Sequence, residues 1–307
     1  MKPISSNKGS VTILTTLLAA VIITVGLGFN WLVKEHMKAS EGLKNKAEAI
    51  LKARSAYDTL IYLVLNGVVT QREIVSTTGR GISELKTLPL NGQKVPLSED
   101  IFVQAQDSNG LLSLVTLNTG AMQRLMKKVG GLDDASGILS SYLDWTDEDN
   151  LSRLNGAEEF YYRGQGLPYA PRNYPVQYKE EIALIKGMDR ELYGKIESFL
   201  TILPSTGFNP NTASDEVLMA YLDIDEDSLK VQKEYMSKGA ISSDTVLFAL
   251  TGRRISGEGE GVHFFPSPYL EVSVSAGRPR SIYTIRAGLD ISQNTNSPYG
   301  ILYWREE

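Results

Sequence analysis

An apolar segment without a charged side chain runs from Ser10 to Val33 and constrains the fold more than any other feature. As a helix of about 24 residues rising about 1.5 Å each, it would measure about 36 Å and cross a bilayer core of about 30 Å. Lys2 and Lys8 precede it, and basic residues favour the cytoplasmic side. The segment predicts a transmembrane helix over residues 10–33, with the N-terminus cytoplasmic and the rest outside the inner membrane.

A small residue, Gly9, stands directly before the apolar segment. An ordinary signal peptide has its small-residue cleavage site after a shorter apolar region. The order found here resembles that of type IV prepilins, which a dedicated peptidase cleaves after the glycine. The resemblance implies a leader over residues 1–9, cleavage by prepilin peptidase between Gly9 and Ser10, and N-methylation of Ser10. An ordinary single-span anchor is the alternative.

Leu14 is the fifth residue counted from Ser10. Most pilins and pseudopilins have glutamate there, which meets the N-terminal amine of a neighbouring subunit, because a carboxylate in lipid is costly unless it is paired. Lack of this glutamate is typical of the minor pseudopilin K family of type II secretion systems, whose members sit at the filament tip. The resemblance implies a subunit with no neighbour above it.

The composition indicates a folded chain that does not bind nucleic acid. Among 307 residues, 42% are hydrophobic and 22% charged, as in globular proteins. There is no cysteine, which excludes disulfides, thiolate metal sites and cysteine nucleophiles. The net charge of -5 disfavours binding to phosphate backbones.

The order of hydrophobic patterns predicts an α+β fold, in which an antiparallel sheet is interrupted by a large all-helical insertion. Helical spacing continues the transmembrane helix as a stem over 34–66. We divide the rest into a first part of a pilin-like α/β domain at 67–118, the helical insertion at 119–255 and the last strands at 256–307. Predicted strands cover 101–106, 270–275, 281–289 and 301–304. Predicted helices cover 121–129, 135–143, 180–185, 190–199, 214–222, 225–238 and 243–250.

Asp107-Ser108-Asn109-Gly110 is a strong turn signal. It predicts that residues 111–117 return as a strand or extended segment. The same four residues resemble an aspartate-glycine turn of the pseudopilin K family.

Further motifs strengthen the resemblance to that family, and together they touch most of the chain in the expected order. They are Trp145-Thr146-Asp147-Glu148-Asp149, Gly156-Ala157-Glu158-Glu159, Pro168-Tyr169 and Asn209-Pro210-Asn211-Thr212-Ala213.

Four carboxylates, Asp147, Asp149, Glu158 and Glu159, lie within a dozen residues and repel one another unless solvated or bound to a cation. Oxygen ligands without histidine or cysteine suit Ca²⁺. The loop is not an EF-hand, since position six counted from Asp147 is Ser152 instead of glycine. From the residues alone a solvated acidic loop is favoured over a cation site. The family resemblance implies a structural Ca²⁺ bound by these four residues.

Two other functions are disfavoured. Residues 209–213 resemble the opening of a helix-hairpin-helix module, but the acidic turn at 222–227 would repel DNA. His36 and His263 lack ligand spacing, and neither a G-x-S-x-G nor a Walker motif is present. Adjacent Glu158 and Glu159 make a poor glycosidase pair, so we expect no enzymatic activity.

The combined prediction is a minor pseudopilin at the tip of the type II secretion pseudopilus, which initiates or caps filament assembly for protein export. Its expected partners are other minor pseudopilins of the I and J kinds, the prepilin peptidase and the inner membrane, with the C-terminal head in the periplasm. The alternatives are a minor pilin of a DNA-uptake or adhesion pilus and a membrane-anchored wall hydrolase.

Overall fold

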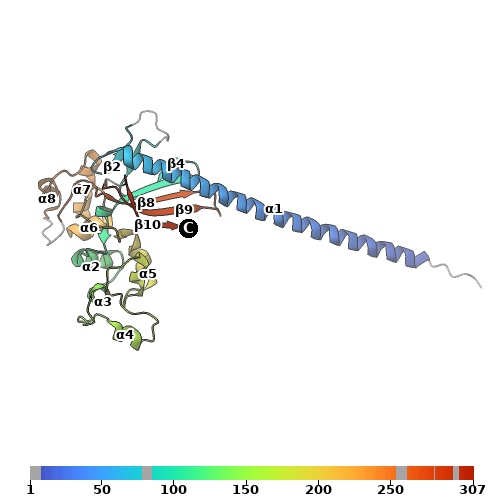
Figure 1. Cartoon of the computed structure of the whole chain (residues 1–307), viewed down its shortest axis with the longest axis horizontal. Coiled ribbons are helices and arrows are strands. Elements are labelled where there is room, and N and C mark those ends of the chain that lie inside the picture. The colour runs from blue at the N-terminus through green and yellow to red at the C-terminus, as the bar shows by residue number, and fades with distance from the viewer. Residues whose placement is uncertain (1–7, 78–84, 254–260, 280, 293–296) are drawn as a thin grey trace, which may run out of the picture.

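A computed structural model describes residues 8–77, 85–253, 261–279, 281–292 and 297–307. Its longest element is the helix α1 (Lys8–Asn66), which projects from the rest of the molecule as a straight rod (Figure 1). The exposed half is long and apolar enough to span a membrane. There the hydroxyls of Thr15, Thr16 and Thr24 donate to carbonyls one turn earlier, which satisfies these polar groups inside the helix.

The C-terminal half of α1 packs on a sheet. Its buried face begins with small residues at Ala49, Ala53 and Ala56 and continues with larger ones such as Leu60 and Val64. The small side chains let the helix approach the strands closely. The helix ends at Asn66, where a Cβ on Gly67 would lie 2.4 Å from Ile74 Cγ2.

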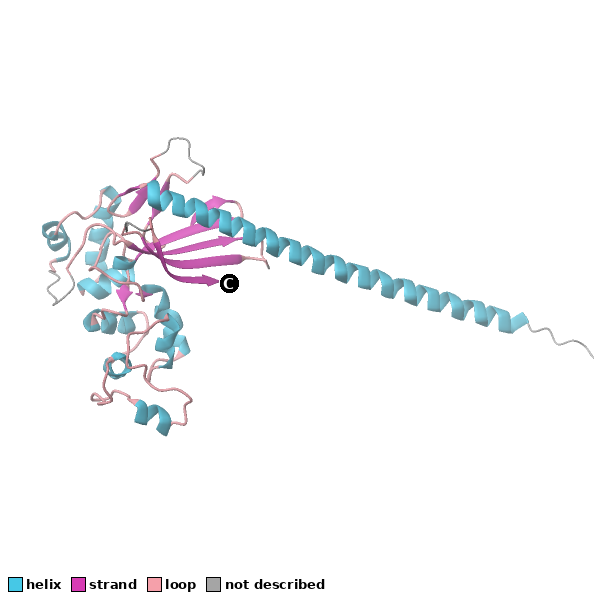
Figure 2. Cartoon of the chain, viewed as in Figure 1, coloured by secondary structure: helices cyan, strands magenta, loops and turns pink. Residues whose placement is uncertain are grey.

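The main sheet has five antiparallel strands in the order β10-β9-β8-β5-β4, beneath α1 (Figure 2). Their bounds are β4 (Val95–Ser98), β5 (Ile101–Asp107), β8 (Tyr269–Ala276), β9 (Tyr283–Asp290) and β10 (Gly300–Glu306). Alternate residues of β8 are buried, as expected for a strand with one face on the core. A smaller antiparallel sheet joins β1 (Val68–Val69), β2 (Glu73–Val75) and β3 (Thr87–Pro89).

A helical domain is inserted between β5 and β8, which pair with each other along their whole lengths. Its α-helices are α2 (Thr119–Lys128), α3 (Ser136–Thr146), α4 (Glu159–Gly164), α5 (Arg190–Ile196), α6 (Asp215–Leu222), α7 (Glu226–Lys238) and α8 (Asp244–Thr251). Short 3₁₀ turns are η1 (Ser108–Gly110), η2 (Lys179–Leu184) and η3 (Glu197–Phe199). Side chains of Asn118, Asp189, Ser214, Asp225 and Ser243 cap helix N-termini.

The hydrophobic residues form two separate cores. One joins α1 to the main and smaller sheets, and the other lies wholly within the helical domain. In Figure 1 the helical domain extends across the direction of α1 instead of along it. The molecule therefore consists of a head built on the stem and a second body set crosswise.

The α+β fold with its interrupted antiparallel sheet is confirmed. The turn predicted at Asp107–Gly110 is present, but the strand after it does not return along β5. These residues form the 3₁₀ turn η1, and the short strand β6 (Leu112–Ser113) that follows pairs in parallel with β7 (Leu200–Thr201). β5 instead pairs with β8 and β4, because its apolar face belongs to the head core. The segment predicted as a helix at 180–185 is the 3₁₀ turn η2.

Candidate functional sites

Three carboxylates meet where the chain leaves α3 and enters α4. Asp144 lies on α3, Asp147 is the C-cap of that helix, and Glu158 is the N-cap of α4. Each offers an oxygen within 4.8 Å of the others. Asp144 and Glu158 are buried, so the loop 147–158 folds back to place the two ends of one acidic segment together.

The loop can close because two of its residues have unusual backbone requirements. A Cβ on Gly156 would lie 2.0 Å from Asp144 Oδ2, so only glycine lets the chain pass the carboxylate. Asn155 adopts a left-handed conformation with φ 65°, which asparagine tolerates better than most residues. The Lys186 ammonium then holds the turn by donating to the carbonyls of Asn155 and Gly156 at 3.2 and 3.0 Å.

Glu158 is the electrostatically unusual member of the cluster. Neither of its carboxylate oxygens has a hydrogen-bond partner among the described residues, and neither does Asp147 Oδ1. Burial, and after it the charges of Asp144, Asp147 and Asp149, raise the pKa of Glu158 to about 7. A buried acid with no donor is unfavourable when ionised unless a cation neutralises it.

Arg153 supplies part of the compensating charge. Its guanidinium donates to Asp144 Oδ1 at 2.8 Å and also to Asp147 Oδ2, and its backbone N–H donates to Asp144. These hydrogen bonds raise the pKa of Arg153. Glu158 accepts none of them, so the guanidinium pairs with only two of the three carboxylates and leaves the Glu158 oxygens and Asp147 Oδ1 as unused acceptors.

An aromatic layer lies against the cluster. The Trp145 ring meets Tyr162 edge-on at 5.4 Å between centroids, and Tyr169 lies 6.2 Å from it. Tyr162 is fully buried, and its hydroxyl accepts from the backbone N–H of Lys186. An apolar layer of this kind lowers the local dielectric constant, which strengthens the interaction of a nearby carboxylate with a cation.

The structure brings together only some of the predicted ligands. Asp147 and Glu158 belong to the cluster, but the Asp149 carboxylate accepts the N–H of Leu151 at 2.7 Å and Glu159 pairs with Arg163. Asp144 was missed. Its spacing gave no clear signal, because Tyr142, two residues earlier, lies on a different side of the helix, and the neighbour one turn earlier is the polar Ser141.

The membrane-anchoring residues lie at the far end of α1. Leu14 is on the apolar part of the helix and is exposed. The helix backbone includes Gly9 and Ser10, the predicted cleavage site. Residues 1–7 of the predicted leader lie outside the described residues.

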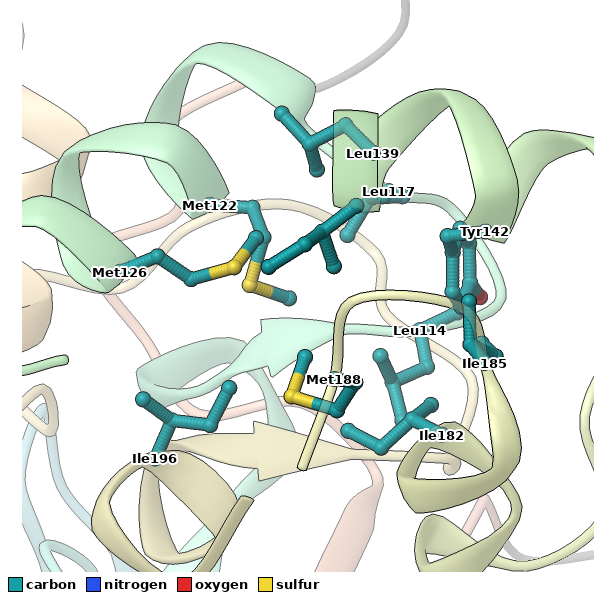
Figure 3. Close-up of a pocket in the computed structure, with 11 residues that line it drawn as sticks. Leu114, Leu117, Met122, Met126, Leu139, Tyr142, Ile182, Ile185, Met188 and Ile196 are labelled. Carbon is teal, nitrogen blue, oxygen red and sulfur yellow. The ribbon is translucent and has the colours of Figure 1, made fainter. Parts of the chain in front are cut away.

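A small cavity in the helical domain carries no binding chemistry. It is lined by apolar side chains, including Met122, Met126 and Met188 (Figure 3), and its volume is about 10 Å³. That is room for about one water molecule. The hydroxyl of Tyr142 at its edge donates to the Leu114 carbonyl, so the cavity is a packing gap in the core.

The chain is similar in sequence to proteins of one family. The family model described as Type II secretion system (T2SS), protein K matches residues 103–205, which include Asp107 and the carboxylate cluster. Type II secretion system protein K of Pectobacterium carotovorum subsp. carotovorum is 22% identical over 250 residues, covering 75% of this chain and 74% of that protein. The Aeromonas hydrophila protein of the same name is 29% identical over 154 residues, covering 48% and 45%.

A solved structure, the GspK-GspI-GspJ complex from the enterotoxigenic Escherichia coli type 2 secretion system, matches with a TM-score of 0.49 and 17% sequence identity. The match covers 90% of this chain and 99% of the matched chain.

A long apolar helix that continues into a sheet-packed stem defines the class of pilin-like, membrane-anchored subunits. The interrupted sheet and the match to the family model narrow this class to one kind of subunit. The chain is similar to the protein K family of the type II secretion system, and these matches support a minor pseudopilin of that system.

Proposed function

We propose that this minor pseudopilin occupies the tip of the pseudopilus, where it initiates or caps the filament during protein export. The observation that carries the proposal is Leu14, an apolar residue where a subunit with a neighbour above it would place glutamate. The crosswise helical domain supports the same position (Figure 1). A body that extends beyond the stem-and-sheet head would obstruct another subunit stacked on that side.

The partners we propose are other minor pseudopilins, of the kinds I and J. The edge strand β10 is a suitable contact, because Ile301, Leu302 and Trp304 are half exposed. The Trp304 ring meets Tyr57 of α1 edge-on at 4.9 Å. This exposed apolar surface lies beside the stem, where the stem of a neighbouring subunit could pack on it.

We further propose that the protein acts by assembly instead of catalysis, with α1 in the inner membrane, the N-terminus cytoplasmic and the head periplasmic. Prepilin peptidase would cleave after Gly9 and methylate Ser10. The support is Lys8-Gly9-Ser10 directly before an uninterrupted apolar helix.

The carboxylate cluster fits a structural Ca²⁺. The donors are hard oxygens, and the unpartnered atoms of Glu158 and Asp147 are available acceptors. Asp144, Asp147 and Glu158 would hold the ion. When bound, it would supply the positive charge that the buried Glu158 lacks and would fix the loop 147–158 against α3. Asp149 and Glu159 remain possible outer ligands only if the loop rearranges.

Complementation tests the function. Expression of the full chain in a strain without its own protein K should restore export of a secreted enzyme into the medium. A Gly9→Val variant should remain uncleaved and fail to restore export, whereas Phe265→Arg, an exposed change on the head surface, should behave as wild type. Restored DNA uptake without restored export would favour the alternative of a type IV pilus subunit.

A second experiment tests the tip position. Leu14→Glu places an unpaired carboxylate in the membrane helix at a cost of about 2.5–3.5 kcal/mol, so it should impair export modestly. Increased pseudopilus assembly by this variant would show that position 14 faces a neighbouring amine, and the tip proposal would be abandoned.

A further inference from the structure

The boundary between the two hydrophobic cores is occupied by a buried polar network. Asp107 ends β5 at the entrance to the helical domain, and Ser267 precedes β8 at its exit. Both residues are buried, as are Asn109 and Asn209 beside them. Buried polar side chains therefore lie where the two ends of the inserted domain meet the head.

The Asp107 carboxylate is the centre of this network and has no spare acceptor position. Oδ1 accepts from Asn109 N at 3.1 Å, Ser267 N at 2.9 Å and Ser267 Oγ at 2.7 Å. Oδ2 accepts from Asn209 Nδ2 at 3.1 Å and Thr212 Oγ1 at 2.8 Å. One carboxylate thus connects the entrance, the middle and the exit of the inserted domain.

Neighbouring asparagines extend the connection into the helical domain. Asn109 donates its amide to Thr206 Oγ1 at 2.9 Å, and its backbone carbonyl accepts from Asn209 N at 2.8 Å. Asn211 exchanges two bonds with the backbone of Ile241, at 2.8 and 2.9 Å. A fully satisfied buried network is directional and rigid, unlike hydrophobic contact, which has no preferred direction.

The turn after Asp107 has no room to adjust. A Cβ on Gly110 would lie 2.5 Å from the Thr212 carbonyl oxygen and 2.6 Å from Gln106 Nε2. The Gln106 amide also donates to Thr212 O at 3.1 Å. The entrance strand and the 209–212 segment are therefore in direct backbone contact.

Two ion pairs add to the connection, and the first of them is largely shielded from solvent. Lys179 pairs with Glu271 of β8 at 2.8 Å, and Glu271 also accepts from Thr201 Oγ1 at 2.7 Å. Glu180 pairs with Arg305 of β10, but that pair is half exposed and contributes little. The fully buried carboxylate is the stronger constraint.

We propose that Asp107 is a positioning residue, which sets the angle between the helical domain and the stem-bearing head. Each body has its own apolar core, so each can remain folded when the network is weakened. The angle between them depends on bonds with defined directions, and these converge on one carboxylate. This inference does not depend on the tip position or on Ca²⁺.

The chain has no cysteine, so introduced pairs can be spin-labelled without background. We would place one label at Ser55→Cys on α1 and the other at Gln165→Cys after α4, both exposed positions. A control pair, Lys127→Cys with Gln165→Cys, lies entirely within the helical domain. Distances would be measured by electron–electron double resonance on the full chain in detergent micelles.

In the Asp107→Asn background, the 55–165 pair should lose its single narrow distance distribution, while the 127–165 pair should keep it. Asp134→Asn, which alters an exposed acid bonded to Ser136, should change neither pair. An unchanged 55–165 distribution would overturn the proposal. So would equal broadening of both pairs, because the carboxylate would then maintain the domain itself.

If Asp107→Asn does not yield folded protein, Ser267→Ala decides the question. It removes one donor to the same carboxylate and leaves the acid in place. The proposal requires a smaller broadening or shift of the 55–165 distance with the 127–165 distance preserved, and it fails if the two distances respond together or neither responds.

Discussion

Asp107 and Glu158 are both buried acids, but their surroundings are opposite. Asp107 accepts hydrogen bonds from five donors on three separated segments. Glu158 accepts none among the described residues and lies beside two further carboxylates. Burial raises the pKa of both, but at Asp107 the hydrogen bonds from Ser267, Thr212 and Asn209 oppose the effect. The comparison distinguishes a carboxylate whose acceptor positions are all used within the fold from one that is free to bind a cation.

The largest effect should follow Asp107→Ala. The change leaves several buried donors without an acceptor, and each such donor costs about 1–3 kcal/mol, so we expect a loss of about 3 kcal/mol or more in unfolding free energy. Urea denaturation checks the value. A loss below about 1 kcal/mol would mean that water replaces the carboxylate, and the contrast with Glu158 would disappear.

Glu158→Gln should change the unfolding free energy differently in chelator and in Ca²⁺. In chelator it removes an unpaired buried charge and should raise the unfolding free energy by about 1 kcal/mol or leave it unchanged. In Ca²⁺ at a hundredfold excess over Kd, wild type should gain about 2.7 kcal/mol that the variant lacks. Thermal unfolding in both conditions measures the reversal. Identical wild-type curves with calcium and with chelator would show that the cluster holds no ion.

The pH dependence in chelator should come from the same carboxylate. Because folding raises the pKa of Glu158 from the ordinary 4.5 to about 7, the folded state holds the proton more tightly than the unfolded chain. That contribution to stability is present below about pH 4.5 and is lost as the pH rises through about 7. Glu158→Gln should flatten this part of the profile. A decline that persists in the variant would assign it to another group.

The smallest effects should follow changes at the two acids outside the cluster. Asp149→Asn alters an exposed side chain and Glu159→Gln a half-exposed one, and each should change stability by no more than about 0.5 kcal/mol. The calcium-dependent shift in melting temperature should survive in both. Its loss in either variant would mean that the loop rearranges to the four-carboxylate arrangement expected from the sequence.

The sequence predicted the helices and strands that have a clear short-range signal. The stem, α6, α7 and α8 follow from helical spacing and N-cap residues such as Ser214, Asp225 and Ser243. The last three strands follow from their apolar alternation. The short strands β1 to β3 carry too few residues for a periodic signal.

Distant contacts account for what sequence reasoning missed. Asp107 has the local pattern of a turn, but its carboxylate bonds to residues up to 160 positions away, which no short-range signal reveals. Asp144 was overlooked for a related reason. Its role depends on contact with Glu158, which lies at the other end of the loop 147–158. It also depends on burial, which a run of acidic residues does not suggest.

The pairing of β5 with β8 also bears on the order of folding. As the chain is synthesised, β5 emerges long before the strand that will cover its edge, since the whole helical domain lies between them. Closing so large a loop is entropically costly, but the helical domain has its own core and can fold first, bringing its two ends together. We expect pulse-labelled hydrogen exchange to show protection in α2 and α6 before β5. The folded inserted domain would then hold the end of β5 close to the start of β8. The strands β8, β9 and β10 could therefore pair with β5 without closing a long disordered loop.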